Sequence, residues 1–167
     1  MKREYRGRNF FMFYGGPLSN WYPSEFKVGG TKYNCGEQWM MHQKAVIFND
    51  IPTASKILLE SSPEEQKKLG RIVDSYDDDV WADNRYDVVK LGLTSKFKQN
   101  PELEGYLLGT SGYELVEASP TDKIWGIGYG EDDPDLFYHI GLWGENLLGK
   151  VLMDIRNDIQ KEKNVIW

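Results

Sequence analysis

Residues 34–48 constrain the fold of this chain more than any other segment. Placed on a helix of 3.6 residues per turn, the segment gathers its apolar residues on one arc, with Glu37 and Lys44 near the middle of that arc. An unpaired charge facing an apolar core is costly, so the two charges need either each other or a ligand-lined cleft. They lie two turns apart on one side, about 10 Å along the axis. A small molecule fits between them. The apolar arc consists of Met40, Met41, Ala45, Ile47 and Phe48.

The same helix also has a purely structural interpretation. Trp39 and Val46 fall on the opposite side of the helical wheel, so the helix is either buried all round or its charged side chains reach outward to other partners. Perturbed ionisable groups favour functional sites, but structural ion pairs perturb them too. The central helix alone therefore does not decide between a site and an ion pair.

The flanking segments predict a compact α+β fold, mostly helical, with a few short strands. Strands are expected at 9–14, 25–28, 31–33 and 113–117, the middle two forming a hairpin across Gly29-Gly30. Strands and long helices do not alternate, which argues against a doubly wound sheet. No repeat or linker divides the chain, so 1–167 is predicted to be a single domain. Helices are expected at 50–59, 62–70, 80–99, 101–108 and 145–161, the last with an apolar core stripe.

Charge and composition limit the partners. The formal net charge of −6 argues against broad affinity for a nucleic-acid backbone. The single cysteine, Cys35, cannot form an internal disulfide, and no apolar run approaches the roughly 18 residues of a membrane span. We therefore expect a cytoplasmic protein without membrane partners. The oligomeric state is left open.

Neither a metal nor a cofactor is expected. His42 and His139 are far apart in the sequence, and no cluster of cysteines or carboxylates has the spacing of metal ligands. The acidic run 77–79 suits the start of a helix at Val80 better than a metal site. The glycines of 126–130 do not have the dinucleotide-binding spacing. Thiol catalysis by Cys35 is disfavoured because such a residue is more often a small buried hydrophobe.

Two further pairs of residues suit a ligand pocket. Asp122 and Trp125 are followed by glycines, beginning with Gly126, that allow a ligand to approach the backbone closely. Trp81 and Arg85, one helical turn apart, pair a stacking surface with a fixed cation suited to phosphate. Each has an ordinary structural explanation by itself. Together with the two charges of the central helix, they predict a cleft for a planar ring attached to a phosphorylated sugar.

Three motifs are specific when taken together: Glu37-Gln-Trp39, Ala118-Ser-x-x-Asp-x-x-Trp-Gly-Ile-Gly128 and Asn146-Leu-Leu-Gly149. With the segments around them, they resemble the NADAR superfamily, and in particular its YbiA-like branch. The resemblance covers nearly the whole chain in sequence order. The other matching positions include Phe13, Gly16–Ser24, Lys44–Ala45, Leu69–Arg71, Trp81, Arg85, Lys96–Phe97 and Leu107–Thr110.

This resemblance implies an N-glycosidase. YbiA-like proteins hydrolyse the N-glycosidic bond of early riboflavin-pathway intermediates, which are ribosylamino-pyrimidine phosphates. Other branches of the family remove ADP-ribose from guanine in nucleic acid or act on related ADP-ribose compounds. The implied partner is therefore a small phosphorylated ribosyl substrate, and nucleic acid enters only as an ADP-ribosylated substrate. A non-catalytic module that senses ADP-ribose or a nucleotide is a third interpretation.

The resemblance also implies roles for individual residues. Glu37 is assigned to stabilise the cationic sugar or to act as base, and Asp122 takes the other catalytic role, with their order open. Lys44 either holds the ribose hydroxyls or phosphate, or attacks the opened sugar as an amine if burial lowers its pKa. The residues implied to bind substrate are Asn20, Trp81, Arg85, Trp125 and Gly126, the two indoles stacking on the base and Arg85 holding phosphate.

Overall fold

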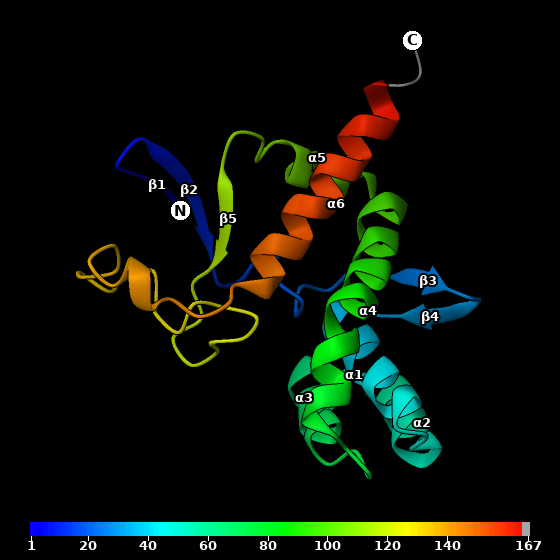
Figure 1. The fold of residues 1–167 in the computed structure, drawn as a ribbon. Helices are drawn as coiled ribbons and strands as arrows, with labels where there is room; N and C mark the ends of the chain where they lie inside the picture. The colour runs from blue at the N-terminus through cyan, green and yellow to red at the C-terminus, as the bar shows by residue number, and fades with distance from the viewer. Residues whose placement is uncertain (165–167) are drawn as a thin grey trace. The chain divides into compact units, whose positions relative to one another are not determined.

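The computed structural model describes residues 1–164, which form two compact units. Unit 1 joins Met1–Ser19 to the chain from Glu102 onward, and unit 2 is the continuous segment Asn20–Pro101. Unit 1 contains strands β1, β2 and β5 with helices α5 and α6, whereas unit 2 contains the hairpin β3–β4 and helices α1 to α4 (Figure 1). The predicted α+β fold, mostly helical with small sheets, is confirmed.

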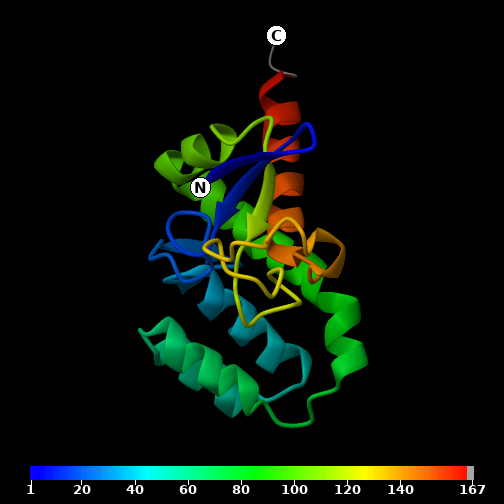
Figure 2. The same cartoon turned by 90° about the vertical axis from the view of Figure 1, so that its left-hand side faces the viewer.

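Unit 1 is built on a three-stranded sheet of order β1-β2-β5. β1 (Lys2–Tyr5) runs antiparallel to β2 (Arg8–Phe13), and β5 (Glu114–Glu117) runs parallel to β2. Helix α6 (Leu147–Asn164) packs against β5 and runs along the sheet (Figure 2). Helix α5 (Pro101–Leu108) and a 3₁₀ turn at Ile140–Leu142 complete the unit.

Strand β1 is the strand that the sequence patterns miss, and the 3₁₀ turn at Ile140–Leu142 was not expected either. Its residues, Lys2–Tyr5, are mostly charged and exposed, so they lack the alternation of apolar and polar residues that marks a strand. The turn that joins β1 to β2 consists of Arg6 and Gly7, with φ of 49° and 75°. Positive φ at both central residues suits a two-residue hairpin, but arginine gives little sequence signal for it.

One core cluster of unit 1 packs a face of the sheet against the segment that follows β5, which contributes Ile127 and Leu136. Phe10 and Met12 of β2 and Val116 of β5 are completely buried. The apolar stripe predicted for the last helix is confirmed, since each of its five residues is at most 2 % exposed. These residues are Leu148, Val151, Leu152, Ile155 and Ile159.

Unit 2 surrounds helix α1 (Gly36–Ile47), which packs against α2, α3 and α4. The predicted hairpin is present as β3 (Phe26–Val28) and β4 (Thr31–Tyr33). Helix α4 begins two residues before the expected Val80, because the side chain of Asp77 accepts the Val80 N–H and caps the helix there. The remaining helices are α2 (Ile51–Leu59), α3 (Pro63–Arg71) and α4 (Asp78–Gln99).

The first half of α1 is buried all round. Every residue from Gly36 to Met41 is buried, including Trp39 at 3 % exposure, whereas Val46 is 41 % exposed. Trp39 lies so close to Gly92 of α4 that a Cβ there would meet the indole at 2.2 Å, and its Nε1 donates a hydrogen bond to the Val88 carbonyl. The first half of the central helix is therefore buried all round, as one of the two interpretations of its sequence expected.

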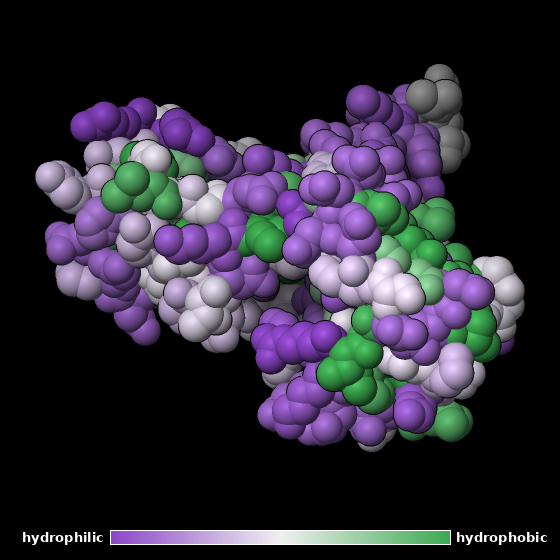
Figure 3. Space-filling view, turned by 60° about the horizontal axis from the view of Figure 1, so that its bottom comes forward, coloured by the Kyte–Doolittle hydropathy of each residue, from purple (hydrophilic) through white to green (hydrophobic). Residues whose placement is uncertain are grey.

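The surface has exposed apolar residues among hydrophilic ones. In Figure 3 the apolar residues form several separate groups on the face that is visible. Leu59, Ile72 and Tyr138 are the most exposed of the large apolar side chains described, at 88 %, 68 % and 86 %. Across residues 1–164 no helix has both the length and the apolar character needed to cross a membrane.

Candidate active site

The candidate carboxylate Glu37 lies in the first turn of α1 and is 3 % exposed. Its backbone N–H donates to the Asn20 carbonyl at 2.9 Å. The Asn20 side chain is equally enclosed, and its Oδ1 has no hydrogen-bond partner among residues 1–164. Gly36 makes room for this oxygen, because a Cβ at that position would lie 2.8 Å from it. A buried acceptor on a residue whose backbone is bonded to that of a buried acid is suited to receive a hydroxyl group of a ligand.

Gln38, the neighbour of Glu37, has a structural role. Its Nε2 lies 3.0 to 3.3 Å from the carbonyls of Ile57, Leu58 and Glu60, at the end of α2, while its Oε1 accepts the Asn34 N–H. The side chain therefore ties the N-terminus of α1 to the C-terminus of α2. In the Glu-Gln-Trp motif, Gln38 and Trp39 hold the helix in place around Glu37.

We expect Gln38→Leu to lower the free energy of unfolding by about 1 to 3 kcal/mol, since three carbonyls at the end of α2 each lose a donor and the Asn34 N–H loses its acceptor. Denaturant unfolding followed by far-UV circular dichroism measures the change. Gln99→Leu is the matched control, because Gln99 also bonds to backbone groups, those of Lys27, but at an exposed place. Equal stability losses in the two variants would contradict the assignment.

Cys35 is the N-cap of α1 and is not arranged as a nucleophile. Its sulfur accepts the Gln38 N–H, and its S–H points to Gln66 Oε1 at 3.2 Å. Burial raises the pKa of the thiol to about 11, so the thiolate is scarce at neutral pH.

Lys44 lies on α1 with its amine held by two groups of unit 2. Its Nζ donates to the Gly70 carbonyl at 2.8 Å and lies 4.0 Å from the centre of the Tyr76 ring. Gly70 is confined by packing, since a Cβ there would lie 1.9 Å from the sulfur of Met41. Burial lowers the pKa of Lys44, the positive charge of Arg71 adds to this effect, and the negative charge of Asp78 opposes it.

Trp81 and Arg85 lie in the first two turns of α4. Trp81 is 6 % exposed, whereas Arg85 is half-buried. The pKa of Tyr76 is raised to about 12 by burial and by Asp78, and the positive charge of Arg85 partly opposes this rise. Lys44 and Arg85 are thus both near the Tyr76 side chain. No sequence pattern marks Tyr76, because it is a lone aromatic residue in the short loop before α4.

In unit 1, Asp122 shapes the loop that follows β5. Its Oδ1 accepts the N–H groups of Ile124 and Trp125, both at 2.8 Å, and its own N–H donates to Ser119 Oγ at 3.3 Å. Gly126 is tightly enclosed, since a Cβ there would lie 2.8 Å from the Cβ of Ser119. One carboxylate oxygen of Asp122 therefore fixes the turn that carries Trp125.

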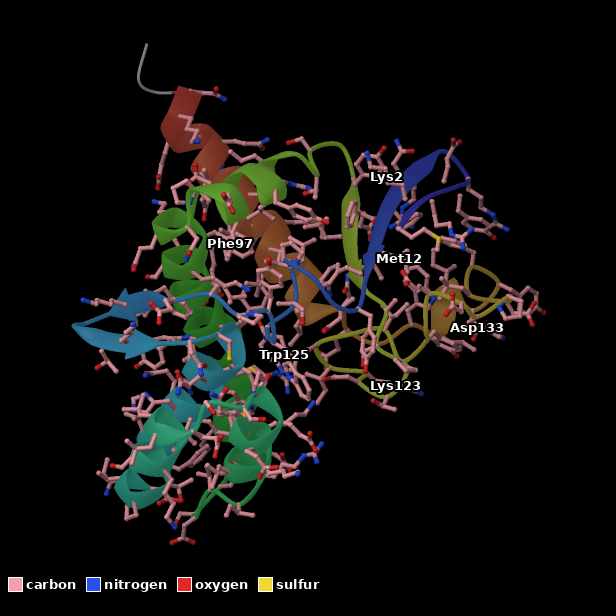
Figure 4. All side chains as sticks on the ribbon, turned by 180° about the vertical axis from the view of Figure 1, so that it is seen from behind. Lys2, Met12, Phe97, Lys123, Trp125 and Asp133 are labelled. Atoms are coloured by element: carbon pink, nitrogen blue, oxygen red, sulfur yellow. The ribbon has the colours of Figure 1, made fainter. Side chains whose placement is uncertain are left out.

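The N-terminus of α6 holds this loop in place. The carbonyls of loop residues 123–126 accept N–H groups of Glu145, Asn146, Leu147 and Leu148 at 2.8 to 3.2 Å. Figure 4 shows Lys123 and Trp125 on the loop. Two of the sequence motifs, one in the loop and one at the start of α6, are thus hydrogen-bonded to each other.

The Asn146 side chain extends the same attachment to the sheet. Its Oδ1 accepts the Glu117 N–H at 3.0 Å, and its Nδ2 donates to the Leu115 carbonyl at 2.9 Å. Asn146 itself has a φ of 51°, a value that asparagine tolerates better than most residues. The start of α6 is therefore bound both to β5 and to the loop that carries Asp122.

The predicted site residues divide between the units. Within unit 2 the structure places Lys44 and Arg85 near one side chain, and it places Asn20 beside Glu37. Within unit 1 it brings Asp122, Trp125 and Gly126 into one turn. That the two groups line one pocket stays a prediction. In the part of the chain that the structure describes, no three His, Cys, Asp or Glu side chains gather as a metal site requires.

Comparison with known proteins identifies the family. A family model for the NADAR domain matches residues 10–160. The chain belongs to the NADAR family. The NMR structure of Escherichia coli YbiA has the same fold, with a TM-score of 0.75, 29% sequence identity, and coverage of 92% of this chain and 86% of that one.

Other relatives of this NADAR chain include proteins named for their activity. It is 40% identical over 149 residues to an N-glycosidase of Acanthamoeba polyphaga mimivirus, covering 86% of this chain and 88% of that protein. The N-glycosidase YbiA of Escherichia coli is 30% identical, with 89% and 84% covered. A riboflavin biosynthesis protein of Vibrio vulnificus is 32% identical over 87% of this chain but only 36% of its own length. These relatives support a hydrolase that acts on N-glycosyl bonds.

Proposed function

We propose that this protein is an N-glycosidase that cleaves the C–N bond between a phosphorylated ribose and a planar base, such as a ribosylamino-pyrimidine intermediate of riboflavin biosynthesis. The observation that carries the proposal is the buried Glu37 carboxylate in the first turn of α1, next to Asn20, whose side-chain oxygen has no hydrogen-bond partner among residues 1–164. The names of the relatives, N-glycosidase and riboflavin biosynthesis protein, point to the same chemistry.

In the proposed reaction, water adds to C1′ of the ribose while the bond to nitrogen breaks, and the departing nitrogen takes up a proton. Positive charge builds on the sugar before water attacks, and an anionic Glu37 stabilises it. Asp122 activates the water or supplies the proton. Since Asp122 Oδ1 is already engaged by two N–H groups, we assign proton transfer to Oδ2. The products are the free base and ribose phosphate.

The remaining residues bind the substrate in this proposal. Asn20 Oδ1 accepts a ribose hydroxyl, because a buried acceptor gains a partner in that way. Trp81 and Trp125 stack on the base, and Arg85 contacts the phosphate. The backbone at Gly126 allows close approach of the ligand. Lys44 holds the ribose or phosphate as a cation, or attacks the opened sugar as a neutral amine.

Product release distinguishes the proposal from its alternatives. The purified protein is incubated with a ribosylamino-pyrimidine phosphate in one tube and with ADP-ribosylated guanine DNA in another, each beside Glu37→Gln, and the products are resolved by chromatography and mass. Free base with ribose phosphate in the first tube alone supports the proposal. Release of a product from the ADP-ribosylated DNA alone would show instead that the protein hydrolyses ADP-ribosyl-guanine. If the protein binds these ligands but releases no product in either tube, it is a non-catalytic sensor of ADP-ribose or a nucleotide.

A further inference from the structure

The aromatic side chain of Tyr76 lies next to Lys44 and has no part in the proposed reaction. The Tyr76 ring lies 4.0 Å from Lys44 Nζ, measured to its centre, and 5.2 Å from the Phe48 ring, at an interplanar angle of 67°. Phe48 follows directly on α1, the helix that carries Lys44. Tyr76 therefore contacts α1 at two places, one an apolar ring and the other an amine.

The segment that carries Tyr76 is fixed to the start of α2. One oxygen of Asp50 accepts the Thr53 N–H and caps α2, while the other accepts the Asp74 N–H at 2.9 Å. The next residue, Ser75, has a φ of 55°, and its N–H donates to the Asp74 side chain. A backbone turn held by the carboxylates of Asp50 and Asp74 thus determines where the Tyr76 ring lies.

The hydroxyl of Tyr76 is engaged as well. It donates a hydrogen bond to Asp78, and burial together with this carboxylate raises the pKa of the phenol to about 12. Tyr76 is therefore a neutral phenol at physiological pH, and its role depends on its ring and its hydrogen bond rather than on proton transfer.

The charges around Lys44 act in opposite directions. Asp78 favours the ammonium form, Arg71 disfavours it, and burial also favours the neutral amine. An aromatic face is a further group that favours the ammonium form, because its quadrupole attracts a cation. Arg85 and Asp77 act on Tyr76 itself. The ring thus adds to the charge of Asp78 in holding the amine as a cation against the Gly70 carbonyl.

We propose that Tyr76 is a positioning residue for Lys44, with its ring, braced by Phe48 and by Asp78, keeping the amine protonated and directed at Gly70 until substrate arrives. The inference concerns the site of the proposed N-glycosidase and gains its catalytic meaning from that function. The effect of the Tyr76 ring on the protonation and position of the Lys44 amine does not depend on any substrate.

The test measures the amine directly in the full-length protein. Reductive methylation modifies only the neutral amine, so its rate at Lys44, followed by peptide mass spectrometry at pH 8, reports the neutral fraction. Tyr76→Leu removes the aromatic face but keeps an apolar side chain, which leaves the burial of Lys44 nearly unchanged. We expect Lys44 to be modified roughly threefold faster or more. Tyr76→Phe, which keeps the ring, should stay within about twofold of the parent protein.

Two controls distinguish an effect of the Tyr76 ring on Lys44 from a general disturbance of the fold. Ile72→Ala, at an exposed position of the same segment, should leave the Lys44 rate unchanged. The rate at the exposed Lys56 serves as an internal standard in every variant. A Lys44 rate in Tyr76→Leu equal to that of the parent, or equal to that of Ile72→Ala, overturns the inference.

Turnover separates this inference from the proposed function. If the parent protein cleaves the N-glycosyl substrate, Tyr76→Leu should shift the pH profile of kcat/KM toward lower pH, because the Lys44 amine loses its proton more readily without the ring. If the labelling rate rises as expected while the parent protein cleaves no substrate, the positioning of Lys44 by Tyr76 stands and the proposed function fails.

Discussion

Replacing Glu37 with glutamine is expected to reduce turnover by at least about a hundredfold while the protein stays folded. Glutamine has nearly the same shape, and the backbone N–H of residue 37 still donates to the Asn20 carbonyl, so α1 keeps its start. The substitution removes the negative charge that the developing cation on the sugar requires. Initial rates of base release at saturating substrate measure kcat, and thermal unfolding confirms that the variant is folded.

The control for Glu37→Gln is Glu102→Gln, which makes the same chemical change at an exposed residue in the first turn of α5. Its rate should equal that of the parent protein. Near-normal turnover of a folded Glu37→Gln variant would rule out the catalytic assignment, because no other change in that variant compensates for the lost charge.

Gly149→Ala is expected to lower the free energy of unfolding by about 3 kcal/mol or more. A Cβ on Gly149 would lie 2.1 Å from the Leu115 carbonyl oxygen and 2.6 Å from both polar atoms of the Asn146 amide. The first contact is with strand backbone, which cannot rotate away, and the second displaces the side chain that joins α6 to β5. Urea unfolding monitored by tryptophan fluorescence gives the loss.

Gly105→Ala is expected to change the stability of the protein in the opposite direction. Gly105 lies within α5, and a Cβ there meets no atom within 4 Å. Alanine at an unobstructed helical position should stabilise the protein by about 0.5 to 1 kcal/mol. A Gly149→Ala variant as stable as Gly105→Ala would show that α6 tolerates movement away from β5, contrary to the close packing described above.

The local elements were predictable because short-range signals specify them. The carboxylate of Asp50 and the hydroxyl of Ser62 cap the helices for which they were expected, and the Gly29-Gly30 turn has the positive φ that its hairpin requires. What the sequence could not supply was the contact between Gly92 and Trp39. A glycine within a helix predicts a weak point, and only the three-dimensional packing shows that an indole occupies the space.

Part of the candidate site was also predictable from short-range sequence patterns. Glu37 and Lys44 are noticeable because charges on an apolar arc require an explanation, and the resemblance to the family supplied one. Tyr76 carries no comparable signal, since its relation to Lys44 depends on how the loop before α4 folds back on α1. Asp122 also shapes its own loop by accepting two backbone hydrogen bonds, and this structural role cannot be recognised from the sequence.

The arrangement of the two units determines an order of events during synthesis. Unit 2 is one continuous stretch of chain, whereas the sheet of unit 1 pairs Phe10 with Glu114, about a hundred residues later. A growing chain therefore completes Asn20–Pro101 while β2 still lacks its parallel neighbour. The exposed edge of β2 has to wait for β5 to leave the ribosome, and in this interval the nascent protein is most open to chaperones and to mispairing.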